Sequence, residues 1–336
     1  MNQPTTTNAR VAALAERKAR ASLDQVLTSR QMVFVTGKGG VGKSVVAATL
    51  ALRARALGLR PVLFECDSPA RLSLFPGGKA VKDDISEVAP GILGINQKSD
   101  DAIRDYAAST LPSKTVADLL FENRVARLFL RASPSVAEMA LIGRIALIAE
   151  QYGQDGPVIV DLHATGHAIN LLRAPGGIMR VLQKSKGALW ERAQAIERML
   201  QDKTRTAFVT VAVPEELPVS ELLELHDKLI AEGAPIGPVI LNAMVPEAAA
   251  VSPEAVAALS SSPQTAAAGR DLGFLLAQRA RCVREEARLR ERLTALHGEA
   301  LIVTLPVRAD NSDERLAPRL EEALSRPVIV PAVEAA

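Results

Sequence analysis

The sequence has few cysteines, no long apolar run and no excess of either charge. Only Cys66 and Cys282 are cysteines among its 336 residues, and neither belongs to a C-x-x-C pair. This argues against a disulfide framework or a zinc knuckle and fits a reducing compartment. No uncharged apolar run reaches the roughly 18 residues that a membrane span needs, and the polar N-terminus is not a secretory signal. With a formal net charge of +2, no nucleic-acid partner is expected. We therefore expect a cytoplasmic protein without stable membrane insertion.

Short apolar runs alternate with helical segments along most of the chain. The runs are rich in β-branched residues and are apolar at every position, which is typical of strands covered on both faces, as in a parallel sheet. Six of them lie at 32–37, 61–67, 157–161, 207–215, 238–244 and 301–307, and helices are predicted at 9–29, 43–57, 218–232 and 271–297. The alternation predicts an α/β fold with a doubly wound, mostly parallel sheet.

The domain boundaries follow from the same patterns. Residues 1–30 are predicted to be a tail and a helix packed outside the core, residues 31–330 a single α/β domain, and residues 331–336 a C-terminal tail. Two mainly helical intervals, about 99–151 and 168–204, flank the strand at 157–161 and predict an inserted α-helical subdomain. Residues 246–270 are rich in Ala, Ser and Pro, which predicts a mobile surface loop. No internal repeat is visible, so we expect one such domain and not two fused copies.

A phosphate-binding loop follows the first predicted strand. The octet GKGGVGKS at residues 37–44 satisfies G-x-x-x-x-G-K-[ST], with a strand before it and a helix after it. The glycines let backbone N–H groups converge on phosphate oxygens, and the helix N-terminus adds partial positive charge. Lys43 is predicted to reach the β and γ phosphates, and the Ser44 hydroxyl to bind Mg²⁺. The residues predicted to bind nucleotide here are Gly37, Lys38, Gly39, Gly40, Val41, Gly42, Lys43, Ser44 and Val45.

A Mg²⁺–nucleotide site also needs carboxylates at the ends of neighbouring strands, where they hold metal-bound water and orient the attacking water. Asp161 ends the apolar run at 157–161 and is placed for this role. Asp67, at the end of the run at 61–67, is the second candidate.

Two motifs resemble a known family. The form K-G-G-x-G-K-[ST] is similar to the deviant Walker A loop of the signature-lysine ATPases, because Lys38 precedes Lys43 in the loop. After Asp161, the triplet Thr165-Gly166-His167 resembles the switch II segment D-x-A-P-T-G-H of the ArsA/Get family, although His163 stands where that family has alanine. This family includes arsenite-pump ATPases and targeting factors for tail-anchored proteins. The resemblance runs from about residue 27 to residue 325.

The resemblance implies cofactors, partners and further site residues. It implies ATP and Mg²⁺, with Lys38 crossing to the nucleotide of a partner chain, and hence a homodimer or a heterodimer with a homologous ATPase. Glu215 would contact nucleotide across the dimer, and Asn242 would hydrogen-bond the adenine base. Pro306 and Val307 would flank the adenine. The implied catalytic residues are Lys38, Lys43, Asp67 and Asp161, and the implied metal ligands are Ser44, Asp67 and Asp161.

The sequence departs from the family in two further places. Where the family has D-P-A, this chain has Asp67-Ser68-Pro69-Ala70, so either Asp67 replaces the water-positioning aspartate or the protein hydrolyses ATP slowly. The two distant cysteines cannot form the three-thiol site of an arsenite pump, nor the C-x-x-C zinc clasp of the eukaryotic targeting factor. Any dimer must therefore form without that zinc.

The leading hypothesis is a dimeric ATPase whose nucleotide cycle switches a helical subdomain that binds an unidentified client or partner. The apolar segments at 140–148 and 178–182 could line a groove for a membrane-protein client or simply pack against each other. One alternative is a nucleotide-gated regulatory protein with little turnover, alone or as half of a heterodimer. Further alternatives are a positioning ATPase similar to ParA or MinD, and a P-loop kinase for small molecules.

Overall fold

The computed structural model describes residues 6–66, 74–98, 101–102, 134–162, 166–183, 187–245, 253–307 and 313–328. Asp67, Ser68, His163 and Thr165 lie outside these ranges. So do the tail at 331–336 and most of the interval at 99–151, so the inserted subdomain stays a prediction.

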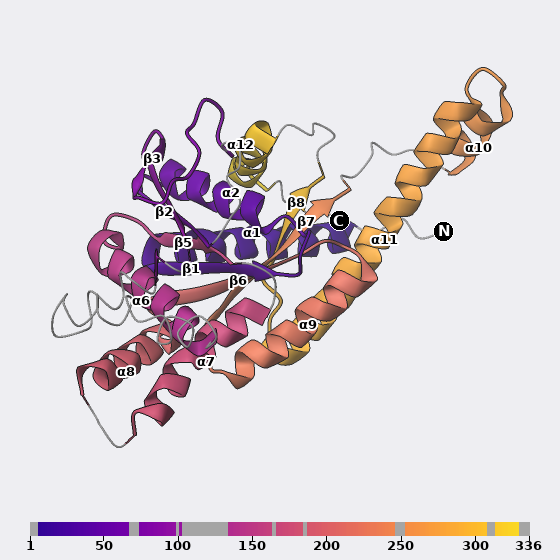
Figure 1. Ribbon diagram of the computed structural model, residues 1–336. Helices are drawn as coiled ribbons and strands as arrows, with labels where there is room; N and C mark the ends of the chain where they lie inside the picture. Colours follow the sequence, from indigo (N-terminus) through magenta and orange to yellow (C-terminus); the bar gives the residue numbers. More distant parts are fainter. Residues whose placement is uncertain are drawn as a thin grey trace.

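An eight-stranded sheet forms the centre of the described structure, in the order β3-β4-β2-β5-β1-β6-β7-β8 (Figure 1). Every neighbouring pair is parallel except β3 and β4, which pair antiparallel at one edge. The strands are β1 (Met32–Gly37), β2 (Val62–Cys66), β3 (Ser86–Ala89), β4 (Ile92–Gln97), β5 (Val158–Asp161), β6 (Thr206–Ala212), β7 (Ile236–Met244) and β8 (Ile302–Pro306). The predicted doubly wound, mostly parallel α/β fold is confirmed.

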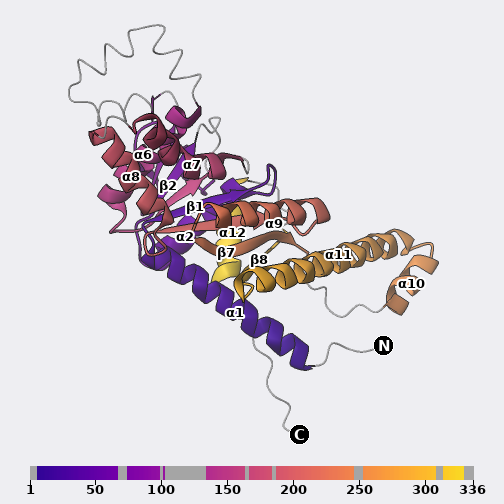
Figure 2. The same cartoon turned by 90° about the horizontal axis from the view of Figure 1, so that it is seen from below.

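Helices cover both faces of this sheet (Figures 1 and 2). One face carries α1 (Thr6–Ser29), α2 (Lys43–Ala56) and α12 (Asp313–Ser325). The other carries α6 (Pro134–Tyr152), α7 (Gly166–Val181), α8 (Ala188–Gln201), α9 (Glu216–Ala231) and α11 (Ala266–His297).

Alternate side chains of each central strand enter different cores. In β1, Val33 and Val35 pack with α1, α2 and α12, whereas Met32 and Phe34 pack with α6, α7 and α8. Phe34 also stacks on Phe208 of β6, with ring centroids 4.8 Å apart. Because both faces are covered, these strands are apolar at every position.

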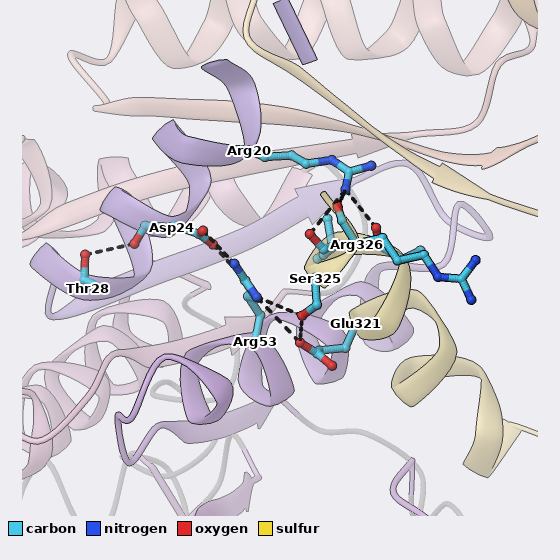
Figure 3. Close-up of polar contacts among 9 residues, drawn as sticks. Arg20, Asp24, Thr28, Arg53, Glu321, Ser325 and Arg326 are labelled. Atoms are coloured by element: carbon cyan, nitrogen blue, oxygen red, sulfur yellow. Dashed lines mark hydrogen bonds and ion pairs between the residues drawn. The ribbon is translucent and has the colours of Figure 1, made fainter. Parts of the chain in front are cut away.

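The N-terminal helix belongs to the core more fully than predicted. Leu23 and Leu27 are buried in the same core cluster as the apolar side chains of α2, whereas Val11, nearer the start of the helix, is 61% exposed. Figure 3 shows the polar contacts that fasten this helix. Arg53 of α2 donates to both carboxylate oxygens of Asp24, at 2.8 and 2.7 Å. Arg20 donates to the carbonyl oxygens of residues 323, 324 and 326 at the end of α12, at 2.8, 3.2 and 3.0 Å. These bonds satisfy carbonyl groups that a helix end leaves free.

The prediction of a mobile loop at 246–270 is wrong for the residues that the structure describes. Residues 253–261 form helix α10 (Pro253–Ser261), and α11 already begins at Ala266. Alanine is the strongest helix former, and the prediction gave too much weight to the neighbouring serines and prolines. The two helices pack on each other, and the outer part of α11 leaves the body of the molecule together with α10 (Figures 1 and 2).

Among the helices that the structure describes, none is long and apolar enough to cross a membrane.

Candidate functional site

The predicted site residues that the structure describes lie along one edge of the sheet. Parallel strands end at a common edge, and β1 ends at Gly37, beside β5, where Val35 is in register with Asp161. On the other side of β1, the strands β6, β7 and β8 end near Glu215, Asn242 and Pro306 respectively. This is the edge at which open α/β sheets bind ligands.

The loop between β1 and α2 closes upon itself. Gly42 is the N-cap of α2, with a left-handed φ of 89°, and no side chain caps this helix end. The Lys43 ammonium donates to the carbonyl oxygen of Lys38 at 3.0 Å. Val41 is buried, and its carbonyl accepts a hydrogen bond from the Asn242 Nδ2 at 3.0 Å. The loop therefore surrounds the N-terminus of α2. The backbone N–H groups there carry partial positive charge, and the N-cap residue Gly42 has no side chain that could accept a hydrogen bond from them.

Two glycines of the loop meet close neighbours. A Cβ on Gly42 would lie 2.5 Å from the Asn242 Nδ2, and a Cβ on Gly37 would lie 2.2 Å from the carbonyl oxygen of Val211. By contrast, a Cβ on Gly39 would meet nothing within 4 Å. The motif glycines at 37 and 42 are thus needed for packing as well as for ligand approach.

The Lys43 side chain is placed to bind an anion. Burial lowers the pKa of Lys43, and the nearby Asp161 carboxylate acts in the opposite direction. Asp161 is itself only 6% exposed. A half-buried ammonium at a helix N-terminus has lost part of its hydration, so a phosphate oxygen would be a favourable replacement.

Oxygen donors for a magnesium ion are present but few. Ser44 lies in the first turn of α2 and Asp161 at the end of β5, while Asp67 lies outside the described residues. No group of three or more His, Cys, Asp or Glu side chains suited to hold a metal occurs in the described ranges. Hydroxyl and carboxylate donors suit Mg²⁺, which usually keeps several waters and takes phosphate oxygens as ligands. The donor set therefore fits Mg²⁺ bound together with a nucleotide.

Lys38 is held by its own chain. Its ammonium pairs with the Glu221 carboxylate of α9 at 2.6 Å, and the two side chains are 34% and 33% exposed. Both residues line a cavity of about 660 Å³ between the loop, α7 and α9, together with Asn170, Arg173 and Lys228. The sequence analysis did not single out Glu221, because no local motif links residues 183 positions apart.

The remaining predicted residues lie at the periphery of the loop. Glu215 is the exposed N-cap of α9. The backbone N–H of Val307, which is 45% exposed, donates to the Met244 carbonyl at 2.8 Å. Asn242 uses its amide to brace Val41, a role that the resemblance did not indicate. His167 is exposed in the first turn of α7.

The sequence model of the anion-transporting ATPase (ArsA) family matches residues 30–191 and 184–264. The chain belongs to the ArsA ATPase family. This confirms the family resemblance that the loop and the T-G-H triplet indicated.

Curated relatives of this family are distant. The "Arsenical pump-driving ATPase" of Escherichia coli is 28% identical over 216 residues, covering 63% of this chain and 35% of the relative. "ATPase ARSA1" of Chlamydomonas reinhardtii is 24% identical over 279 residues, covering 64% and 35%. "ATPase GET3C" of Arabidopsis thaliana is 23% identical over 289 residues, covering 70% and 73%. The match thus spans about a third of the length of the first two relatives.

Proposed function

We propose that this chain binds Mg-ATP at residues 37–45 and hydrolyses it as a dimer. The observation that carries the proposal is the uncapped N-terminus of α2 beside the partly desolvated Lys43. Such an end is complementary to phosphate, and family membership adds that ATP is the nucleotide.

Each residue of the loop has a distinct task in this proposal. The backbone N–H groups and Lys43 hold the β and γ phosphates, and Ser44 and Asp161 hold the magnesium ion. When bound, Mg²⁺ neutralises charge that develops on the phosphate oxygens. Asn242 fixes the loop through Val41 and, with Pro306 and Val307, borders the place for the base.

Lys38 is proposed to serve the nucleotide of a partner chain. In the described structure Lys38 forms an ion pair with Glu221 of its own chain. For Lys38 to reach another chain, this ion pair must open. Since both side chains are about one-third exposed, the pair contributes little to stability, and its opening costs correspondingly little.

The nucleotide state is proposed to reach a client through α7. This helix begins at Gly166, five residues after Asp161, and packs on α6 and α8. A change at Asp161 on hydrolysis is therefore proposed to move α7 within the cluster that it shares with α6 and α8. The client or partner protein is unidentified.

The test is phosphate release under Mg-ATP, together with ATP binding by calorimetry. The proposal predicts slow but measurable turnover and saturable binding, both lost in Lys43→Ala. Folded protein that binds no ATP would refute it.

A nucleotide-gated regulator with little turnover is the second candidate, because Ser68 replaces the aspartate of D-P-A. Single-turnover hydrolysis separates the two. A burst of product that Asp67→Asn abolishes indicates the enzyme, whereas tight binding without a burst indicates the regulator.

A further inference from the structure

The outer part of α11 extends past the edge of the sheet that carries the phosphate loop. Arg288 of α11 donates to the Ser220 hydroxyl of α9 at 3.0 Å. Further along, the His226 Nδ1 of α9 and the His297 Nε2 of α11 lie 3.3 Å apart. The two helices thus run in the same direction, and residues 266–284 precede the level at which α9 begins to pack on α11. The inner end of this segment still packs on the sheet, because Arg279 donates to the Val245 carbonyl oxygen at 2.6 Å and Cys282 is buried. At a 1.5 Å rise per residue these residues span about 27 Å. We call α10 and residues 266–284 the arm (Figures 1 and 2).

One face of α11 carries a line of arginines. Residues at three- and four-residue intervals share a helix face, and this face bears Arg270, Phe274, Ala277, Arg281, Arg284, Arg288 and Arg292. Arg270, Arg281, Arg284 and Arg292 form no ion pair with any residue that the structure describes. Phe274 is 60% exposed, and the adjacent Leu275 is 51% exposed. The arm is therefore basic with an apolar centre.

The outer face of α9 has the opposite charge. Glu216, Glu224 and Asp227 lie on one side of this helix together with Ser220, and all three acids are exposed. None of the three forms an ion pair within the described ranges. Leu217, in the first turn, is 60% exposed. This face adjoins the arginine line at the contact between Ser220 and Arg288.

We infer that a second copy of this chain binds here, with the arm of each copy lying along α9 of the other. In a two-fold dimer the basic patch of each copy meets the acidic patch of the other copy. The same pair of complementary surfaces therefore forms two equivalent contacts. Phe274 and Leu275 would meet Leu217 between the charges. Complementary charges of this kind set the register and speed association. The inference rests on the proposed nucleotide-dependent dimer and names its surface.

The position of the arm supports this partner over an unrelated acidic protein. The arm passes the edge at which the phosphate loop, Glu215 and the Lys38 cavity lie. In the proposed dimer each copy would present this edge to the other, so that Lys38 and the arm would face the same partner. Both contacts then form in one association step.

A charge exchange between two variants tests the inference. One chain carries Arg281→Glu and Arg284→Glu on the arm, and the other carries Glu224→Arg and Asp227→Arg on α9. With Mg²⁺ and a non-hydrolysable ATP analogue, the wild type is expected to sediment as a dimer, and each variant alone as a monomer or with at least tenfold weaker pairing. An equimolar mixture restores the dimer, because both contacts again join opposite charges. The control Arg17→Glu on α1 replaces an exposed arginine that forms no ion pair within the described part of the chain. It is expected to dimerise as the wild type does.

Calorimetry with ATP on the arm variant keeps the two proposals separable, because Arg281 and Arg284 lie outside the loop, whereas Glu224 lines the cavity of Lys38 and Gly39. The inference is overturned if folded, ATP-binding variants pair as the wild type does, or if the mixture stays monomeric. A wild type that stays monomeric with nucleotide and instead binds polyglutamate through the arm also overturns it. Loss of ATP binding by the wild type itself would refute the proposed function.

Discussion

Gly42→Ala is the most direct perturbation of the phosphate loop. Gly42 has a φ of 89°, a left-handed conformation that costs roughly 1–2 kcal/mol for a residue with a Cβ. The added methyl would lie 2.5 Å from the Asn242 Nδ2, so Asn242 must move and give up its bond to Val41. A lost hydrogen bond of this kind costs about 1 kcal/mol. We therefore expect Gly42→Ala to lower the free energy of unfolding by about 2–3 kcal/mol.

A double-mutant cycle separates the two contributions. Asn242→Ala alone should cost about 1 kcal/mol, because it removes the same bond to Val41. In the double variant that bond is lost only once and the clash is relieved, so the summed single effects should exceed the double effect by about 1 kcal/mol.

The assay is urea denaturation of the four proteins, followed by circular dichroism. Gly39→Ala is the matched control, since a Cβ there meets nothing within 4 Å, and its free energy of unfolding should change by less than about 0.5 kcal/mol. Strictly additive effects of Gly42→Ala and Asn242→Ala would refute the proposed coupling between loop and amide.

Three further predictions concern ion pairs and a buried histidine. Glu221→Gln, which releases Lys38, should change the free energy of unfolding by less than about 1 kcal/mol. In sedimentation experiments, the ATP-dependent dimer of this variant should form at a lower protein concentration than that of the wild type, and weaker dimerisation would contradict this. Burial, and secondarily His297, lowers the pKa of His226 from 6.5 to about 4. As the pH falls, this histidine therefore takes up a proton in the unfolded chain before it does so in the folded one. Urea titrations should accordingly show the free energy of unfolding falling by about 3 kcal/mol between pH 6.5 and 4. His226→Gln should flatten that dependence, and an unchanged slope would exclude this histidine as its source. Arg53→Met should lower stability by about 1–2 kcal/mol, because Asp24 loses a bidentate partner, whereas methionine at the exposed Arg326 should have almost no effect in the same titration.

The sequence analysis located the six strands whose side chains enter both cores, because continuous apolarity is a strong signal. It missed β3 and β4 at the sheet edge. β3 has only four residues, and β4 contains Gly94 and ends in the buried Asn96 and Gln97. Gly and Asn are depleted in strands, so the local pattern gave no indication of either element.

The site was predictable to the extent that it is local in sequence. The loop from Gly37 to Ser44 is a contiguous motif, and Asp161 follows an unmistakable strand. The ion pair of Lys38 with Glu221 and the brace from Asn242 to Val41 join residues far apart in the chain, and only the packed fold brings these side chains together.

The central claim is that the loop at residues 37–45 binds Mg-ATP. Calorimetric titration of the folded chain with ATP in the presence of Mg²⁺ tests it most directly. The account predicts saturable binding that Lys43→Ala abolishes while Arg17→Glu leaves it intact. Absence of binding heat in the wild type, or equal binding by Lys43→Ala, would contradict the account.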